Sequence, residues 1–157
     1  MSQANRVKML ATVRKMFSFV DDLKADKATK GLDLDEDGVP KQLKALGEEV
    51  YAPEVKFNVP GKGPHAFTGG KKQYYEYNKR LASQTEGNLD LQLLDILVGE
   101  KHAAALVRYS DQRGDQTFSW LRINAFEFNE SCDQIVQIRT YEHDQYGVDA
   151  WYSASLT

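Results

Sequence analysis

The sequence contains a single cysteine, Cys132, and therefore cannot form an internal disulfide. A lone cysteine is typical of a reducing compartment, so we expect a cytoplasmic protein. Long apolar runs are also missing. Arg6, Lys8, Arg14 and Lys15 interrupt the N-terminal segment, which excludes the continuous apolar core of a signal peptide. No segment approaches the roughly 20 apolar residues that a membrane helix needs, so the sequence predicts a soluble protein.

Excess positive charge is absent as well. The net charge is −3 and the sequence pI is about 5.6, which argues against binding to the phosphate backbone of nucleic acid. The histidines His65, His102 and His143 have no spacing that suits a metal site, and the sequence has no glycine-rich phosphate loop. We therefore expect no metal, no cofactor, and no nucleic-acid or membrane partner.

What the sequence does contain fits one globular domain. With 157 residues, of which 41% are hydrophobic and 27% charged, the chain is long enough to bury a core, and we take residues 1–157 as a single domain. Apolar residues at helical spacing predict an amphipathic helix over residues 4–24 and a second helix that Pro53 closes. A short strand is expected at residues 55–59, and Gly69-Gly70 precedes a third helix.

From residue 88 on, the hydrophobic pattern has a period of two, which is typical of strands. We expect strands over residues 89–98 with an internal bulge, then 102–109, 117–128 and 135–142, followed by a short helix at 148–152. The strand at 117–128 places six side chains on one face: Phe118, Trp120, Arg122, Asn124, Phe126 and Phe128. A face of this kind needs helices to cover it, so the sequence predicts an α+β domain.

A polar stretch at residues 28–38 separates the first two predicted helices. Its segment Asp33-Leu34-Asp35-Glu36-Asp37-Gly38 is similar to the start of an EF-hand loop. The rest of that pattern fails, because Lys44 stands where the bidentate glutamate belongs and Pro40 interrupts the loop. We interpret the stretch as a solvated acidic turn.

Two segments carry a resemblance to a known superfamily. They are Phe57-Asn58-Val59-Pro60-Gly61, with the loop to Phe67-Thr68-Gly69, and the ending Arg139-Thr140-Tyr141-Glu142-His143-Asp144-Gln145-Tyr146. With these segments and its element order, the chain resembles the SnoaL-like group of the nuclear transport factor 2 superfamily, which includes ketosteroid isomerase and polyketide cyclases. The resemblance implies a cystatin-like cone, in which a curved antiparallel sheet wraps around the N-terminal helices and encloses one small-molecule pocket. The reaction stays open because this superfamily hosts many activities.

The catalytic positions of the characterised relatives are not matched. By the resemblance, the aspartate base of ketosteroid isomerase corresponds to Asn58, its protonated aspartate to Asn124, and its first-helix tyrosine to Met16 or Phe17. An amide cannot accept a proton at neutral pH, although it can donate a hydrogen bond to an oxyanion. The last-strand aspartate of the epoxide hydrolases corresponds to Thr140. We therefore expect neither of these two activities.

Alternation along the last strand places Thr140 and Glu142 on its interior side. Glu142 is the candidate general acid or base; the alternative is a carboxylate at the mouth of the cone, solvated or paired with Arg122. His65, in a Gly/Pro-rich loop, is the second catalytic candidate, and its alternative is an exposed loop histidine. The aromatic face could line a cavity or form solid core. The candidate ligand-binding residues are Asn58, Asn124, Thr140, Tyr74, Trp120, Phe126, Met16 and Phe17.

Two functions remain open at this point. The first is an isomerase, cyclase or dehydratase that acts by proton transfer on a small apolar or aromatic carbonyl compound, with Glu142 moving the proton and the amides holding the oxygen. The second is a non-catalytic module that binds an apolar ligand or serves as a dimerisation domain. A homodimer is expected in either case, because open faces of such sheets commonly pair.

Overall fold

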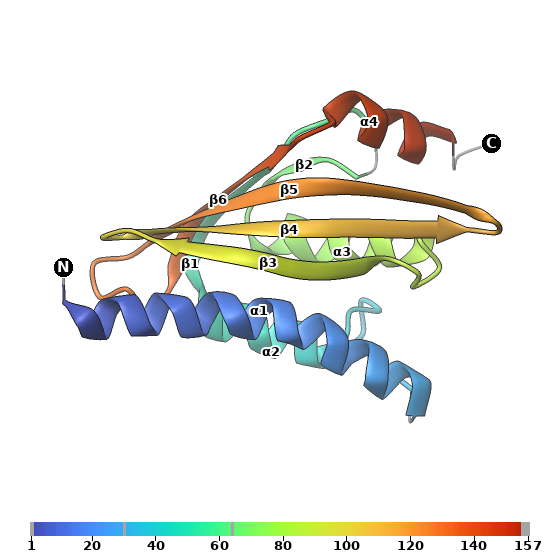
Figure 1. The fold of residues 1–157 in the computed structure, drawn as a ribbon. Coiled ribbons are helices and arrows are strands. Elements are labelled where there is room, and N and C mark those ends of the chain that lie inside the picture. Colours follow the sequence, from blue (N-terminus) through green and yellow to red (C-terminus); the bar gives the residue numbers. More distant parts are fainter. Residues whose placement is uncertain (1, 30, 64, 155–157) are drawn as a thin grey trace.

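Six strands of the described chain form one curved sheet, against which the helices pack (Figure 1). The structure is a computed structural model that describes residues 2–29, 31–63 and 65–154. The strands lie in the order β2-β1-β6-β5-β4-β3. In chain order the elements are α1 (Gln3–Thr29), α2 (Lys41–Val50), β1 (Tyr51–Val59), β2 (Phe67–Gly69), α3 (Lys71–Gln84), β3 (Asp90–Val98), β4 (His102–Arg113), β5 (Gln116–Phe128), β6 (Ile135–Glu142) and α4 (Gln145–Ser153).

The sheet is mixed, which corrects the expectation of a purely antiparallel one. Strands β1 and β6 pair in parallel, and all other pairs of neighbouring strands are antiparallel. Consecutive strands joined by hairpins must run antiparallel, whereas β1 and β6 are separated by most of the chain and can meet in either direction. The α+β class and the curved sheet around the helices agree with the sequence prediction.

The N-terminal helices pack under the sheet, where α1 contacts β3 and β4 and α2 contacts β1. The chain passes from α2 directly into β1 at Tyr51, so the strand begins four residues earlier than predicted. Pro53 lies inside this strand instead of closing the helix. Proline is tolerated there because the pairing of β1 with β6 shifts register between Tyr51 and Lys56, and no ladder hydrogen bond needs the missing N–H.

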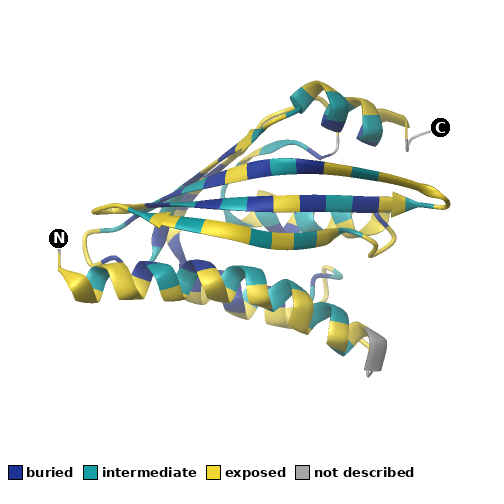
Figure 2. Ribbon diagram, in the orientation of Figure 1, coloured by how far each residue is buried: buried dark blue, intermediate teal, exposed yellow. Residues whose placement is uncertain are grey.

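The long hairpin of β4 and β5 extends into the loop predicted between the two strands. Strand β4 continues to Arg113 and β5 begins at Gln116, and the turn between them contains Gly114 at φ +59°. Along β5 buried and exposed residues alternate as predicted, which Figure 2 shows as bands along the ribbon. The predicted bulge in the strand before this hairpin is also present, between Leu93 and Asp95.

The C-terminal helix α4 begins three residues before the predicted start. Asp144 accepts a hydrogen bond from the Gly147 N–H (2.8 Å) and thereby caps the first turn. The helix is held against the hairpin by Asp111, whose buried carboxylate accepts a hydrogen bond from Trp151 Nε1 (2.7 Å). The Arg113 guanidinium lies 4.5 Å from the centre of the Trp151 ring, which adds a cation–π contact.

Of the polar stretch at residues 28–38, the first two residues belong to α1, residue 30 lies outside the described residues, and residues 31–38 form a turn before α2. Asp35 Oδ1 accepts hydrogen bonds from the N–H groups of Asp37 and Val39, both at 2.9 Å. Lys44, the residue that breaks the calcium-loop pattern, forms an ion pair with Asp35 and holds the pKa of that carboxyl below its ordinary value. Asp33, Glu36 and Asp37 of the turn are exposed, whereas Asp35 is largely buried beside Lys44. None of the described helices has the length and apolarity required to cross a bilayer.

Candidate ligand-binding cavity

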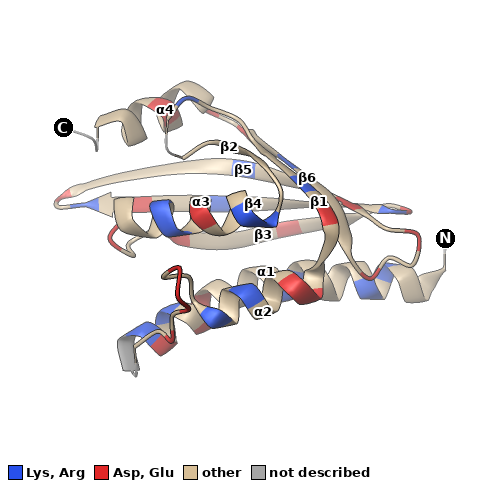
Figure 3. Ribbon diagram, turned by 180° about the vertical axis from the view of Figure 1, so that it is seen from behind, with Lys and Arg blue, Asp and Glu red and all other residues tan. Residues whose placement is uncertain are grey.

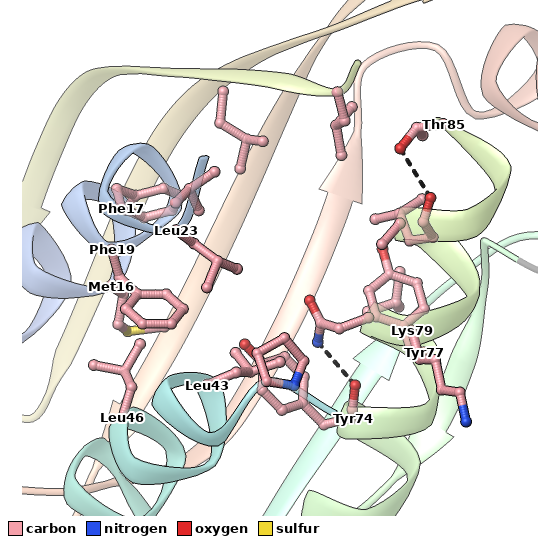
Figure 4. A pocket seen from close by; sticks show the side chains of 18 of the residues that line it. Met16, Phe17, Phe19, Leu23, Leu43, Leu46, Tyr74, Tyr77, Lys79 and Thr85 are labelled. Atoms are coloured by element: carbon pink, nitrogen blue, oxygen red, sulfur yellow. Dashed lines mark hydrogen bonds between the residues drawn. The ribbon is translucent and has the colours of Figure 1, made fainter. Parts of the chain in front are cut away.

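A cavity of about 470 Å³ lies between the inner face of the sheet and the helices α1, α2 and α3. Its volume falls in the range of small-molecule sites. Side chains from two sides face one another across it in Figure 4, where Met16, Phe17, Phe19 and Leu23 of α1 lie on one side and Tyr77 of α3 on the other, with Leu43 of α2 beside Tyr74. Tyr74, Tyr77, Asn78 and Leu81, which share one face of α3 at helical spacing, line this wall.

The cavity opens to solvent at one end, which we call the mouth. Its exposed lining residues come from the end of α1, the turn before α2, the end of α3 and the loop that follows: Lys27, Leu34, Lys79, Ala82 and Gly87. Leu32 and Leu34 therefore give the polar stretch a second role, because they form part of the cavity wall while Asp33, Glu36 and Asp37 are exposed. No local pattern in the sequence indicates this role.

Polar groups gather at the floor of the cavity on β5. Asn124 lines the cavity and is only 6% exposed, and its Nδ2 has no hydrogen-bond acceptor among the described residues. The Tyr109 phenol is the polar neighbour of this amide, and its interaction with the Asn124 side chain lowers the pKa of Tyr109 against the larger effect of burial. Thr140 lies on the adjacent strand and uses its hydroxyl to donate to the Asn58 carbonyl oxygen (3.4 Å). Asn124 is thus left as a buried donor that faces an apolar space.

Arg122 also lines the floor, and its charge is compensated within the protein. Its Nε donates to Glu142 Oε1 (2.7 Å), its Nη2 contacts the same oxygen, and its guanidinium lies 4.5 Å from the centre of the Tyr109 ring. Burial alone would lower the pKa of Arg122, but Tyr77, Tyr109 and Glu142 raise it more, so the group stays charged. The Glu142 side chain is fully buried. It lies behind Arg122 and does not belong to the cavity lining.

The tyrosines around the cavity remain neutral phenols. Burial raises the pKa of Tyr51, Tyr74 and Tyr109 above the ordinary value. At neutral pH these residues can therefore donate hydrogen bonds but cannot act as bases.

The structure brings together six of the eight predicted ligand-binding residues, namely Met16, Phe17, Tyr74, Asn124, Phe126 and Thr140. Asn58 is exposed, which corrects the expectation of two inward amides: Phe57 and Val59 take the inner face of β1, and alternation turns the residue between them outward. Trp120 is buried but stacks on Tyr109 at a centroid distance of 5.5 Å and does not line the cavity.

His65 is 1% exposed and lies outside the cavity lining, so it is neither an exposed loop residue nor placed over the mouth. Its Nε2 donates to Asp149 Oδ1 (2.6 Å), and its ring stacks on Tyr152 at 5.0 Å. Burial raises the pKa of Asp149, but hydrogen bonds from the Lys62 N–H, His65 and Gln145 lower it more, and the net pKa lies below the ordinary value. The histidine therefore attaches its loop to α4.

Tyr109 and the lysines of the mouth are lining residues that the sequence analysis did not single out. Strand geometry supplies a signal for Tyr109, because steps of two residues place it on the same face as Ala103, Ala105 and Val107, which are all buried. No comparable signal identifies the lysines. Their position depends on how α1 and α3 are placed around the cavity.

Comparison of the sequence with protein-family profiles finds no match. No curated protein sequence is significantly similar either. Solved structures do match over nearly the whole chain. Bal32a, from a soil-derived mobile gene cassette, is 17% identical with a TM-score of 0.73 and covers 94% of this chain and 98% of its own.

Two further solved structures are similar at comparable coverage. A candidate polyketide cyclase from Bacillus cereus is 12% identical (TM-score 0.64; 94% of this chain, 86% of its own). A nuclear transport factor 2-like protein from Anabaena variabilis is 14% identical (TM-score 0.62; 90% and 92%). Identities this low establish the fold and leave the activity open. With its mixed curved sheet, its covering helices and these neighbours, the chain has the cystatin-like fold of the nuclear transport factor 2-like proteins.

Proposed function

We propose that the protein binds a small, largely apolar molecule in the cavity and donates a hydrogen bond from Asn124 to an acceptor oxygen of that molecule. The observation that supports this most directly is the buried, unpartnered Nδ2 of Asn124 at the floor of a cavity whose lining is mostly apolar. An unsatisfied buried donor costs about 1–3 kcal/mol. A carbonyl oxygen placed against Asn124 would recover much of this free energy, while the ring and aliphatic side chains would cover an apolar body.

Binding is favoured over the proton-transfer reaction that the sequence also suggested. Among the described residues that line the cavity there is no aspartate, glutamate or histidine. Glu142 would have to leave Arg122 and enter the cavity to act as a base, and His65 is bound to Asp149 elsewhere. The similarity to a candidate polyketide cyclase supports a pocket for an organic molecule but supplies no base in this chain.

The test compares two probes of nearly equal shape, acetylnaphthalene, which carries a ketone, and ethylnaphthalene, which does not. Calorimetry on the wild-type protein should show the ketone binding about threefold to tenfold more tightly, as expected for one net hydrogen bond. Asn124→Leu should remove this preference, because the donor is gone while the apolar wall remains. Equal preference in the wild type and in Asn124→Leu would refute the role of the amide.

Asn78→Leu is the matched control, since it makes the same chemical change in the same cavity. The Asn78 Nδ2 already donates to the Tyr74 carbonyl oxygen (2.8 Å), so the ketone preference should persist in this variant. Met16→Trp introduces a bulkier side chain into the cavity and should weaken the binding of both probes. Unchanged binding in Met16→Trp, with a native circular dichroism spectrum, would show that the probes bind elsewhere and would overturn the proposed function.

A further inference from the structure

The charged residues that line the cavity all have the same sign. Among the described lining residues they are Lys24 and Lys27 of α1, Lys79 of α3 and Arg122 of β5. Figure 3 shows basic bands on the helices of both walls. The chain as a whole carries a net charge of −3, so this distribution is local to the cavity and opposite to the overall charge.

The basic residues act at two different depths. Arg122 at the floor is 6% exposed and is paired with the fully buried Glu142, so the floor carries no net charge. An anion placed there would meet Glu142 as well as Arg122, and the available polar group at that depth is the neutral amide of Asn124. The floor is therefore suited to a neutral acceptor such as a carbonyl oxygen.

The lysines at the mouth retain an excess of positive charge. Lys24 shares an exposed ion pair with Asp90 (Nζ–Oδ1 3.0 Å), and this aspartate does not line the cavity. Lys79 Nζ donates to the main-chain oxygen of Asp37 (2.6 Å), which positions the ammonium group without neutralising it. Lys27 is exposed on the last turns of α1. Three ammonium groups thus belong to the lining of the opening, whereas the carboxylates nearby, Asp90 and Asp37 among them, lie outside the lining.

We infer that the ligand is an amphipathic anion, with an apolar body inside the cavity and a carboxylate or sulfonate-like group held at the mouth by Lys24, Lys27 and Lys79. This inference rests on the proposed function and adds the charge and orientation of the ligand. The apolar end enters first, and the anionic end stays where water and the lysines can solvate it. Because the pairs at the mouth are partly exposed, the preference for an anion must weaken as salt increases.

Two fluorescent probes with one shared skeleton test the inference: anilinonaphthalene sulfonate, an anion, and phenylnaphthylamine, its neutral counterpart. At low ionic strength the wild-type protein should bind the sulfonate about tenfold more tightly than the neutral dye, corresponding to a few partly exposed charge contacts. The variant with Lys24→Gln, Lys27→Gln and Lys79→Gln should lose this preference and bind the neutral dye within about twofold of the wild type.

The control variant carries Lys8→Gln, Lys56→Gln and Lys72→Gln, an identical change in net charge at lysines outside the cavity lining. It should keep the preference for the sulfonate. If the wild type binds both dyes equally, or if the control loses as much of the preference for the sulfonate as the mouth variant, the inference is wrong while the proposed cavity function stands. If neither dye binds to the wild type, or if both bind to Met16→Trp as tightly as to the wild type, the proposed function fails together with the inference.

Discussion

The buried ion pair between Arg122 and Glu142 should contribute strongly to stability, and Glu142→Gln tests this with a minimal change. The side chains of Arg122 and Glu142 are 6% and 0% exposed, and Nε lies 2.7 Å from Oε1. Glutamine keeps the shape of the glutamate and can still accept a hydrogen bond from Nε, but it removes the charge that compensates a buried guanidinium.

Removing one partner of a buried pair costs about 3–5 kcal/mol, because the other charge is left uncompensated. The retained hydrogen bond places Glu142→Gln at the lower end, at about 3 kcal/mol. For a domain of this size, such a loss lowers Tm by about 6–12 °C. The matched control is Glu130→Gln. Glu130 pairs with Lys101 through a side chain that is 90% exposed, so the same substitution there should cost less than about 1 kcal/mol.

Urea unfolding followed by circular dichroism measures both losses. A double-mutant cycle with Arg122→Met isolates the interaction, and the double variant should be less destabilised than the sum of the two single variants by at least about 1 kcal/mol. A Glu142→Gln variant as stable as Glu130→Gln, or strictly additive losses in the cycle, would show that Arg122 does not depend on Glu142 for its compensating charge.

The two remaining predictions concern α4 and the outer face of the sheet. Asp149→Asn should destabilise the protein by about 1–3 kcal/mol at neutral pH, since it weakens the bonds from His65 and Lys62. Folding lowers the pKa of Asp149, so its contribution to stability is complete above the unfolded pKa and is lost as pH falls through the folded pKa. The difference in stability between the variant and the wild type should therefore shrink below about pH 4. A difference in the free energy of urea unfolding that stays constant across that range would contradict the assignment. The homodimer stays a prediction from the sequence, and Ile123 and Leu97, which are 44% and 68% exposed on the sheet, are the residues it would cover. Light scattering should then give a dimer mass for the wild type and a monomer mass for Ile123→Asp, whereas a monomeric wild type would refute dimerisation.

Several parts of the fold could be predicted from the sequence because they depend on local periodicity. The alternation of Trp120, Arg122, Asn124 and Phe126 follows from the geometry of a strand, in which successive side chains point to opposite faces. The shared face of Tyr74 and the residues that follow it in α3 depends in the same way on the helical period. The order of the helices and of five of the six strands needed nothing beyond these local rules and the turn residues between them; the short strand β2, which the sequence predicted as part of a loop, was missed.

Predictions about Glu142 and His65 required knowledge of their neighbours, which local patterns do not contain. Both side chains point away from solvent, but each meets a partner far along the chain, Arg122 for Glu142 and Asp149 for His65. Whether an inward carboxylate is a base or half of an ion pair depends on where another strand places its cation. Asn58 was misplaced for a simpler reason: the inner face of β1 belongs to Phe57 and Val59.

The sequence by itself determined most of the helices and strands, the inner face of β5 and the class of the fold, since these follow from residue type and spacing within a few positions. Only the tertiary structure decided that β1 pairs with β6 in parallel, that Leu34 of the polar turn lines the cavity, and that lysines from both α1 and α3 line its mouth. These features depend on contacts between segments distant in the chain. Such contacts arise when whole elements pack, because burial of apolar surface and compensation of buried charge are properties of the assembled domain.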